Sequence, residues 1–374
     1  MKDIRNLSIF SSSGGWKTFL RTAACVLVVL FLGSVVFIMV VDPYASIPFS
    51  PDWERSTVGG DQRLFYPNLA RAARFDSAIV GTSSGRLLRP EDLNKQFASR
   101  FVNLCLNSAS VYEQESMLNI FLAHHPHPKT VIFGIDHVYV DEKYNKPHIE
   151  PAFEWPEWLY DQNPFNNFPP YRLHTLTHAW RQFLSMTGLK TYKYGRDGYT
   201  DFTRPMDEYD LNRARMKIYG TQEPKPVKAV FPPAQMSSAE IDAFKFPNLA
   251  ILVRMLRKLP HETVKILVLM PAHHFIQPAP GSADAIHWQE FLRRLTKLTR
   301  NLPGGYILNF NIPSPITTQD ANYWDGLHYT VVVAAELVSL IAEGVQGTID
   351  NANYVRLVAN KYWALSPPKN FQER

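Results

Sequence analysis

A strand pattern followed directly by a turn of hydroxyl side chains occupies Ser77-Ala78-Ile79-Val80-Gly81-Thr82-Ser83-Ser84-Gly85. The first four residues form a short apolar run that ends at a glycine, which is typical of a strand buried on both faces. Residues 87–98 then show the apolar spacing of a helix, and residues 101–106 form a second strand-like run. This order predicts parallel strands joined by a helical crossover.

The same alternation continues along the chain, with one long interruption. Residues 112–123 predict a helix and residues 130–133 a third strand, which again ends at a glycine. Residues 138–233 are rich in proline, aromatic and charged residues and have no sustained period. The later elements are a helix capped by Ser237 and Glu240, a helix after Pro247, strands at 265–270 and 306–310, and helices at 288–299 and 330–342.

We therefore predict one α/β domain over residues 62–347. It has a five-stranded parallel sheet in a three-layer arrangement and an irregular insertion at 138–233. Residues 348–374 form a C-terminal extension to which we assign no motif.

An uncharged apolar run covers Thr22–Val41. Twenty helical residues span about 30 Å, the thickness of the hydrocarbon core of a bilayer. Basic residues precede the run and Asp42 follows it, so residues 1–21 should be cytoplasmic and the rest of the chain periplasmic. The alternatives are a cleaved signal peptide and a buried core helix, but the run is long and does not end in small residues. We expect a single-pass anchor in a bacterial inner membrane, with residues 42–61 as a linker.

Composition narrows the class of protein. Of 374 residues, 45% are hydrophobic and 20% are charged, as in a globular protein. The net charge of only +5 argues against nucleic acid as the main partner. Cys25 lies in the apolar run and Cys105 in a strand pattern, so no disulfide is expected.

Two clusters should meet at the carboxyl ends of the strands, where open parallel sheets bind their ligands. In the first, Ser83 follows a strand and lies near the start of a helix, whose backbone N–H groups can stabilise an oxyanion. The alternative is that this serine only caps the helix.

The second cluster is Asp325-Gly326-Leu327-His328, just before the last helix. A serine hydroxyl needs a base, an imidazole supplies one near neutral pH, and a carboxylate fixes the imidazole tautomer. The alternative is a simple Asp-Gly turn with a solvated histidine.

Taken together, Gly-x-Ser after a strand and a late Asp-x-x-His resemble the SGNH (GDSL-like) hydrolases, whose sheet is flavodoxin-like. The closest likeness is to their membrane-anchored envelope branch, which includes alginate O-acetylation proteins and the D-alanyl transfer protein of teichoic acids. The resemblance implies that Ser83 is the nucleophile, His328 the base and Asp325 its orienting carboxylate. Ser84 is the competing nucleophile.

Two further blocks of that family match less closely. Its glycine N–H for the oxyanion hole corresponds to Ser108, next to Asn107. Its asparagine donor corresponds to Asp136, and a carboxylate cannot donate a hydrogen bond. Asn107 or another donor substitutes, or Asp136 has a different role, or the site is slow. His273, after the fourth strand pattern, is either a residue that lines the substrate pocket or a polar loop residue.

The resemblance, together with the expected membrane anchor, thus implies a serine esterase or O-acyltransferase that acts on acylated envelope carbohydrate. The resemblance implies a possible membrane-bound acyl-transfer partner. No cofactor is expected and no metal site is assigned, because His124, His125 and His127 lie on a proline-rich turn. The alternative is a non-catalytic envelope component that uses the same cleft to bind glycan or a membrane partner.

Overall fold

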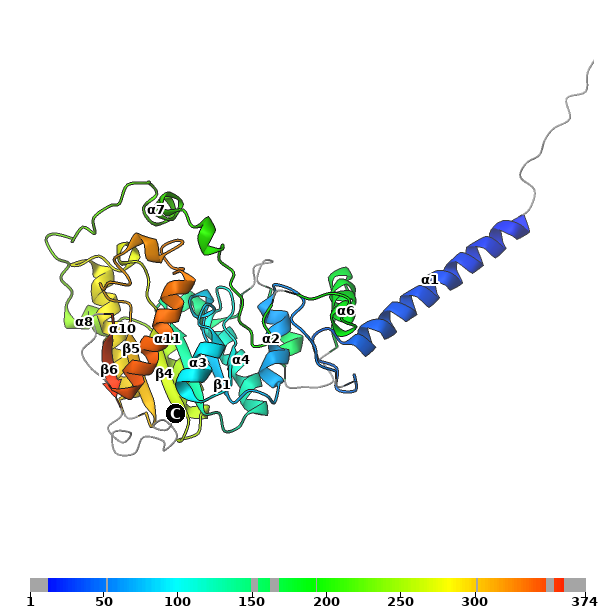
Figure 1. Ribbon diagram of the computed structural model, residues 1–374, viewed down its shortest axis with the longest axis horizontal. Coiled ribbons are helices and arrows are strands. Elements are labelled where there is room, and N and C mark those ends of the chain that lie inside the picture. The colour runs from blue at the N-terminus through cyan, green and yellow to red at the C-terminus, as the bar shows by residue number, and fades with distance from the viewer. Residues whose placement is uncertain are drawn as a thin grey trace, which may run out of the picture.

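A computed structural model describes residues 13–51, 53–148, 154–161, 168–192, 194–300, 302–347 and 353–359. Figure 1 shows an α/β body at one end of the molecule and the helix α1 (Ser13–Val41) projecting from it. The first twelve residues of the expected cytoplasmic segment, and residues 348–352 and 360–374 of the C-terminal extension, lie outside the described residues.

The body is built on one mixed sheet with the strand order β2-β1-β3-β4-β5-β6. Strands β1 to β5 are mutually parallel, and β6 pairs antiparallel with β5. The strands are β1 (Ser77–Val80), β2 (Phe101–Asn103), β3 (Thr130–Ile135), β4 (Val264–Leu269), β5 (Gly305–Asn309) and β6 (Val355–Ala359). The five predicted parallel strands are confirmed, and β6 was not predicted.

Helices cover both faces of the sheet, which gives three layers. Because side chains alternate along a strand, Ala78 and Val80 pack into one core and Ile79 into the other. Helices α2, α4, α9 and α10 contribute to the first core, and α3 and α11 to the second, where Figure 1 shows them in front of the sheet. These helices are α2 (Gln62–Arg71), α3 (Pro90–Phe97), α4 (Val111–His124), α9 (Pro247–Lys258), α10 (Ala283–Thr299) and α11 (Val331–Gln346).

The segment expected to be a linker, 42–61, packs onto the body instead. Asp42 is completely buried and accepts hydrogen bonds from the backbone N–H groups of Ser46 and Ile47. Tyr44 and Val58 belong to the first core. The buried carboxylate of Asp42 organises the turn after α1 and fixes the chain there. Proline and serine content therefore did not indicate a flexible linker.

Residues 138–233 form short helices, and their described part contains no strand. These helices are α5 (Glu157–Tyr160), α6 (Leu173–Met186) and α7 (Leu211–Tyr219), and α8 (Ser238–Asp242) follows with the expected capping box. The segment reaches opposite sides of the α/β body, because α6 lies beside the end of α1 and α7 lies over the far side of the body (Figure 1).

Helix α1 ends at Val41, as the sequence predicted, and residues 15–41 are long and apolar enough to cross a membrane. It is the one such helix in the described part of the chain. Its last turns pack against α6, where Ile38, Val41 and Ala179 form a small buried cluster. Oγ of Ser34 also hydrogen-bonds the hydroxyl of Tyr171, just before α6, at 2.7 Å.

Candidate functional site

The turn after β1 presents a serine hydroxyl at the carboxyl edge of the sheet. Thr82 caps the short 3-10 helix Ser83–Gly85 with its own side chain, which accepts from the N–H of Ser84. The capping alternative for Ser83 is therefore wrong, since Thr82 fills that role. Two glycines allow the close packing: a Cβ at Gly81 would lie 3.2 Å from the carbonyl oxygen of Gly134, and one at Gly85 would lie 2.7 Å from Sγ of Cys105.

Ser83, His328 and Asp325 form a hydrogen-bonded chain. Oγ of Ser83 lies 2.8 Å from Nε2 of His328, and Nδ1 of His328 lies 2.8 Å from Oδ2 of Asp325. The imidazole and the carboxylate are 27% and 30% exposed, so a ligand can reach them. This is the geometry in which a carboxylate orients an imidazole toward a hydroxyl.

The charge of Asp325 is stabilised locally. Burial alone would raise the pKa of its carboxyl, but the hydrogen bonds from the His328 ring and from the N–H groups of Leu327 and His328 outweigh burial and hold the pKa at about 2. The carboxylate therefore stays ionised at neutral pH and keeps Nδ1 of the imidazole protonated.

The loop that carries His328 is closed at its base. An antiparallel bridge joins Tyr323 to Tyr329, and the N–H of Trp324 donates to the carbonyl of His328 at 2.8 Å. The buried hydroxyl of Tyr329 donates to the carbonyl oxygen of Ser84. This contact joins the two distant segments directly and explains why the imidazole faces the serine turn.

Gly326 lets the same loop approach its neighbour. A Cβ at this position would lie 2.9 Å from the side chain of Ile276, and the Gly326 carbonyl accepts from the N–H of His273 at 2.9 Å. The Asp-Gly pair thus serves close packing here, in addition to a turn.

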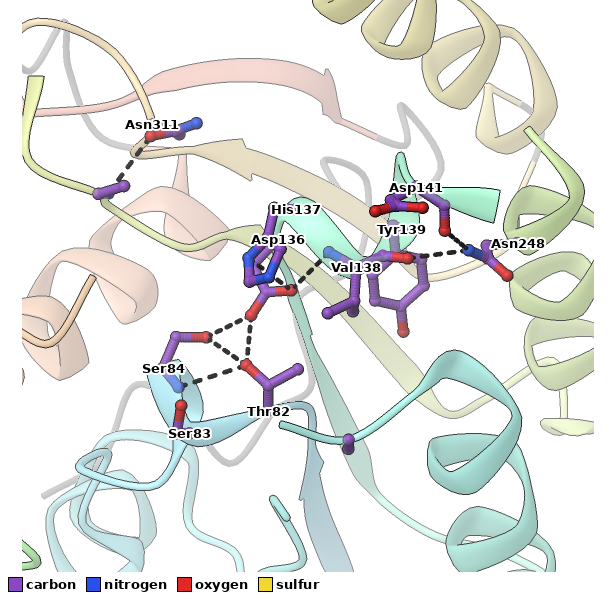
Figure 2. Close-up of polar contacts among 12 residues, drawn as sticks. Thr82, Ser83, Ser84, Asp136, His137, Val138, Tyr139, Asp141, Asn248 and Asn311 are labelled. Atoms are coloured by element: carbon purple, nitrogen blue, oxygen red, sulfur yellow. Dashed lines mark hydrogen bonds and ion pairs between the residues drawn. The ribbon is translucent and has the colours of Figure 1, made fainter. Parts of the chain in front are cut away.

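Ser84, the competing hydroxyl, points elsewhere. Its Oγ donates to Oδ2 of Asp136 at 2.9 Å, and the hydroxyl of Thr82 donates to the same oxygen (Figure 2). The other carboxylate oxygen accepts from the N–H of Val138 at 3.2 Å. Asp136 therefore holds the serine turn against the end of β3, which is one of the roles left open by the sequence.

Asn107 and Ser108 lie on the loop after β2. Arg86 is almost fully buried, and its guanidinium donates to Oδ1 of Asn107. Because arginine can only donate, this contact turns the NH₂ group of Asn107 away from Arg86. Ser108 is exposed and has a φ of 47°, the left-handed region in which glycine is favoured.

His273 does not line an open pocket. It is completely buried, its Nε2 lies 3.2 Å from Oδ1 of Asp320, and its Nδ1 accepts from the N–H of Phe275. Burial lowers the pKa of this imidazole to about 4, so it is neutral at pH 7. Asp320 also accepts from Arg215 and Tyr219 of α7, which attaches that helix to the edge of the sheet.

Two residues that the sequence did not assign to the site, Phe202 and Arg86, lie beside it. The Phe202 ring packs edge-on to His328 with centroids 5.5 Å apart, and the Arg86 guanidinium lies 4.5 Å from its centre. Phe202 comes from the irregular segment, and the one local signal was Gly198, whose left-handed φ of 82° lets that segment approach Asn103 closely.

No protein-family model matches the chain, and no curated protein shows significant sequence similarity to it.

Proposed function

We propose that the chain is a membrane-anchored serine esterase or O-acyltransferase of the SGNH type. In this proposal α1 spans the inner membrane, the α/β body is periplasmic, and the substrate is an acyl ester of envelope carbohydrate. The observation that carries the proposal is the hydrogen-bonded chain from Ser83 through His328 to Asp325. The envelope substrate rests on the sequence resemblance and on α1.

The chemistry has two steps. Oγ of Ser83 attacks the acyl carbonyl while its proton passes to Nε2 of His328, and the imidazolium then protonates the departing alkoxide. An acyl-serine and an alcohol result. His328 next takes a proton from water or from a sugar hydroxyl, whose oxygen attacks the acyl-serine, and the imidazolium returns a proton to Ser83.

The tetrahedral intermediates need donors for their oxyanion. Several donors near the serine turn have no acceptor within the described part of the chain, among them the N–H groups of Ser83 and Ser108 and the side-chain NH₂ of Asn107. Arg86 polarises the Asn107 amide through its oxygen, which strengthens the NH₂ group as a donor. We infer that Asn107 takes the place of the donor that Asp136 cannot supply.

Fluorophosphonate labelling of the full chain in detergent micelles tests the proposal. We expect the wild-type protein and Ser84→Ala to be labelled and Ser83→Ala to remain unlabelled. Labelling that is lost only in Ser84→Ala would show that Ser84, and not Ser83, is the nucleophile.

The second candidate is a non-catalytic component that binds glycan or a membrane partner, and the carboxylate at position 136 favours it. Such a protein would not react with the probe in its wild-type form, although the His328 ring would still contact Ser83.

A further inference from the structure

A groove of about 930 Å³ runs over the ends of β3 and β4, and two of its lining residues are neighbours of the serine turn and of His328. Asp136 and Leu327 line its inner end, next to Ser84 and His328 respectively. Figure 2 shows Asp136 between the serine turn on one side and His137 and Asp141 on the other. We expect a polymer lying in the groove to pass beside the serine turn, so that one of its substituents can reach Ser83.

One wall of the groove is aromatic. Phe244, His287 and Trp288 line it, and the rings of Phe244 and His287 meet edge-on with centroids 4.6 Å apart. Trp288 is supported from behind by the buried ring of Phe291, at 5.4 Å and nearly parallel. Rigid, partly exposed aromatic faces suit the C–H surfaces of sugar rings. Asn311 and Gln277 add amide groups for hydroxyls.

The charge of the groove selects among sugars. Its lining has four carboxyl groups, on Asp136, Asp141, Glu142 and Asp284, and one ammonium group, on Lys245. Lys143 pairs with Asp141 at 2.9 Å, and burial lowers the pKa of His287, so that imidazole adds no positive charge at pH 7. The remaining field is negative and repels a polyanion over a distance of about 8 Å at physiological salt.

We propose that this groove binds the carbohydrate chain of the substrate, and that the chain is a neutral or amino-sugar polymer, not a uronic-acid or phosphate polymer. The inference rests on the proposed function, because it takes Ser83, which lies beside the groove, as the reacting group. It adds a substrate class, which the catalytic residues alone do not define.

Calorimetric binding to full-length Ser83→Ala in detergent micelles tests the substrate class without requiring turnover. The probes are hexamers of glucosamine in its protonated form, of N-acetylglucosamine and of galacturonate. We expect the first two to bind and galacturonate to bind at least about tenfold more weakly, with glucosamine the tightest because it meets the carboxylates.

Two variants locate the binding. Trp288→Ala should weaken the two favoured hexamers about tenfold, and Glu142→Lys with Asp284→Lys should reverse the order of glucosamine and galacturonate. Both acidic residues are exposed, so the double variant leaves the core intact. Asp207→Lys with Glu223→Lys, which are also exposed and lie outside the groove, is the matched control and should change nothing.

The inference is overturned if no hexamer binds, if galacturonate binds as tightly as the others, or if the groove variants behave as the control does. Fluorophosphonate labelling without hexamer binding would remove the groove assignment and leave the enzyme. Hexamer binding without labelling would keep the groove as a carbohydrate site and remove the proposed enzyme activity.

Discussion

Two imidazole–carboxylate pairs lie at the same edge of the sheet and differ in what surrounds them. His328 and Asp325 are 27% and 30% exposed, whereas the side chains of His273 and Asp320 are 0% and 11% exposed. The hydrogen bonds within the pairs are similar, at 2.8 Å and 3.2 Å. Exposure, and not the pairing, separates a residue that can meet a substrate from one that holds loops together.

The ring nitrogen that does not face the carboxylate also differs between the two histidines. In His328 it faces the hydroxyl of Ser83 and can accept its proton. In His273 it accepts a backbone N–H from Phe275, so its lone pair is already used. A histidine beside an aspartate is therefore a candidate base only when its other nitrogen is free to accept a proton.

Replacing His328 should have the largest effect on reactivity. We expect His328→Ala to slow fluorophosphonate labelling about 10³- to 10⁴-fold, since the hydroxyl loses its base, while the unfolding free energy changes by less than about 0.5 kcal/mol. Time courses of labelling and denaturant unfolding measure the two quantities. His137→Ala, an exposed imidazole nearby, is the control, and equal labelling of both variants would contradict the assignment.

Removing the side-chain donor should come next. We expect Asn107→Ala to lower the labelling rate about 10²- to 10³-fold, the usual cost of one oxyanion donor. Ser108→Gly should keep the rate, because its backbone N–H remains, and should stabilise the fold by about 0.5 to 1 kcal/mol by relieving the positive φ. If both variants labelled at the wild-type rate, Asn107 would have no place in the oxyanion hole.

The buried pair should control stability against pH. The pKa of His273 is about 4 in the folded protein and 6.5 when unfolded, so the unfolded chain binds the extra proton between these values. The unfolding free energy should therefore fall by about 3 kcal/mol as the pH drops from 6.5 to 4. In His273→Gln this pH-dependent loss should be smaller by that amount, whereas exposed His127→Gln should keep it. Identical pH profiles for the wild type and His273→Gln would disprove the assignment.

The smallest effect should come from the loop that joins the two pairs. In Gly326→Ala the new methyl group meets Ile276 at 2.9 Å, which should cost about 1 to 3 kcal/mol and slow labelling about tenfold by shifting His328. Ile276→Ala in the same chain removes the contacted atoms and should restore the rate. A failure of this rescue would mean that the glycine acts through backbone freedom and not through space.

Much of the sheet could be predicted because its parallel strands are short apolar runs, and β1 ends at Gly81. Gly134, which was expected to end the third strand, lies inside β3 instead. The ends of helices and the edge strand of the sheet were harder to predict. Helix α3 begins at Pro90, three residues later than expected, because proline fits the first turn of a helix. The β6 strand was missed, since an edge strand is defined by its pairing with β5, which leaves no periodic signal in the sequence.

The proposed catalytic residues could be named from two motifs, since each motif is local. The residues that hold them in place could not be predicted in this way. Arg86 fixes Asn107 across 21 positions, and Phe202 reaches His328 from the irregular segment. Nothing in either stretch alone indicates the other, because these contacts depend on how loops far apart in the chain cross the sheet edge.

The packing of α6 removes the freedom that a tether would give. On one side α6 contacts α1 through Ala179 and Phe183, and on the other His178 hydrogen-bonds Tyr44 of the body at 2.8 Å. Helix α6 thus holds α1 and the body in a fixed relative position. If α1 spans a bilayer as we propose, the fold sets the height and tilt of Ser83 above the lipid surface. The proposed substrate would then have to reach that level, because the body does not hang on a flexible tether.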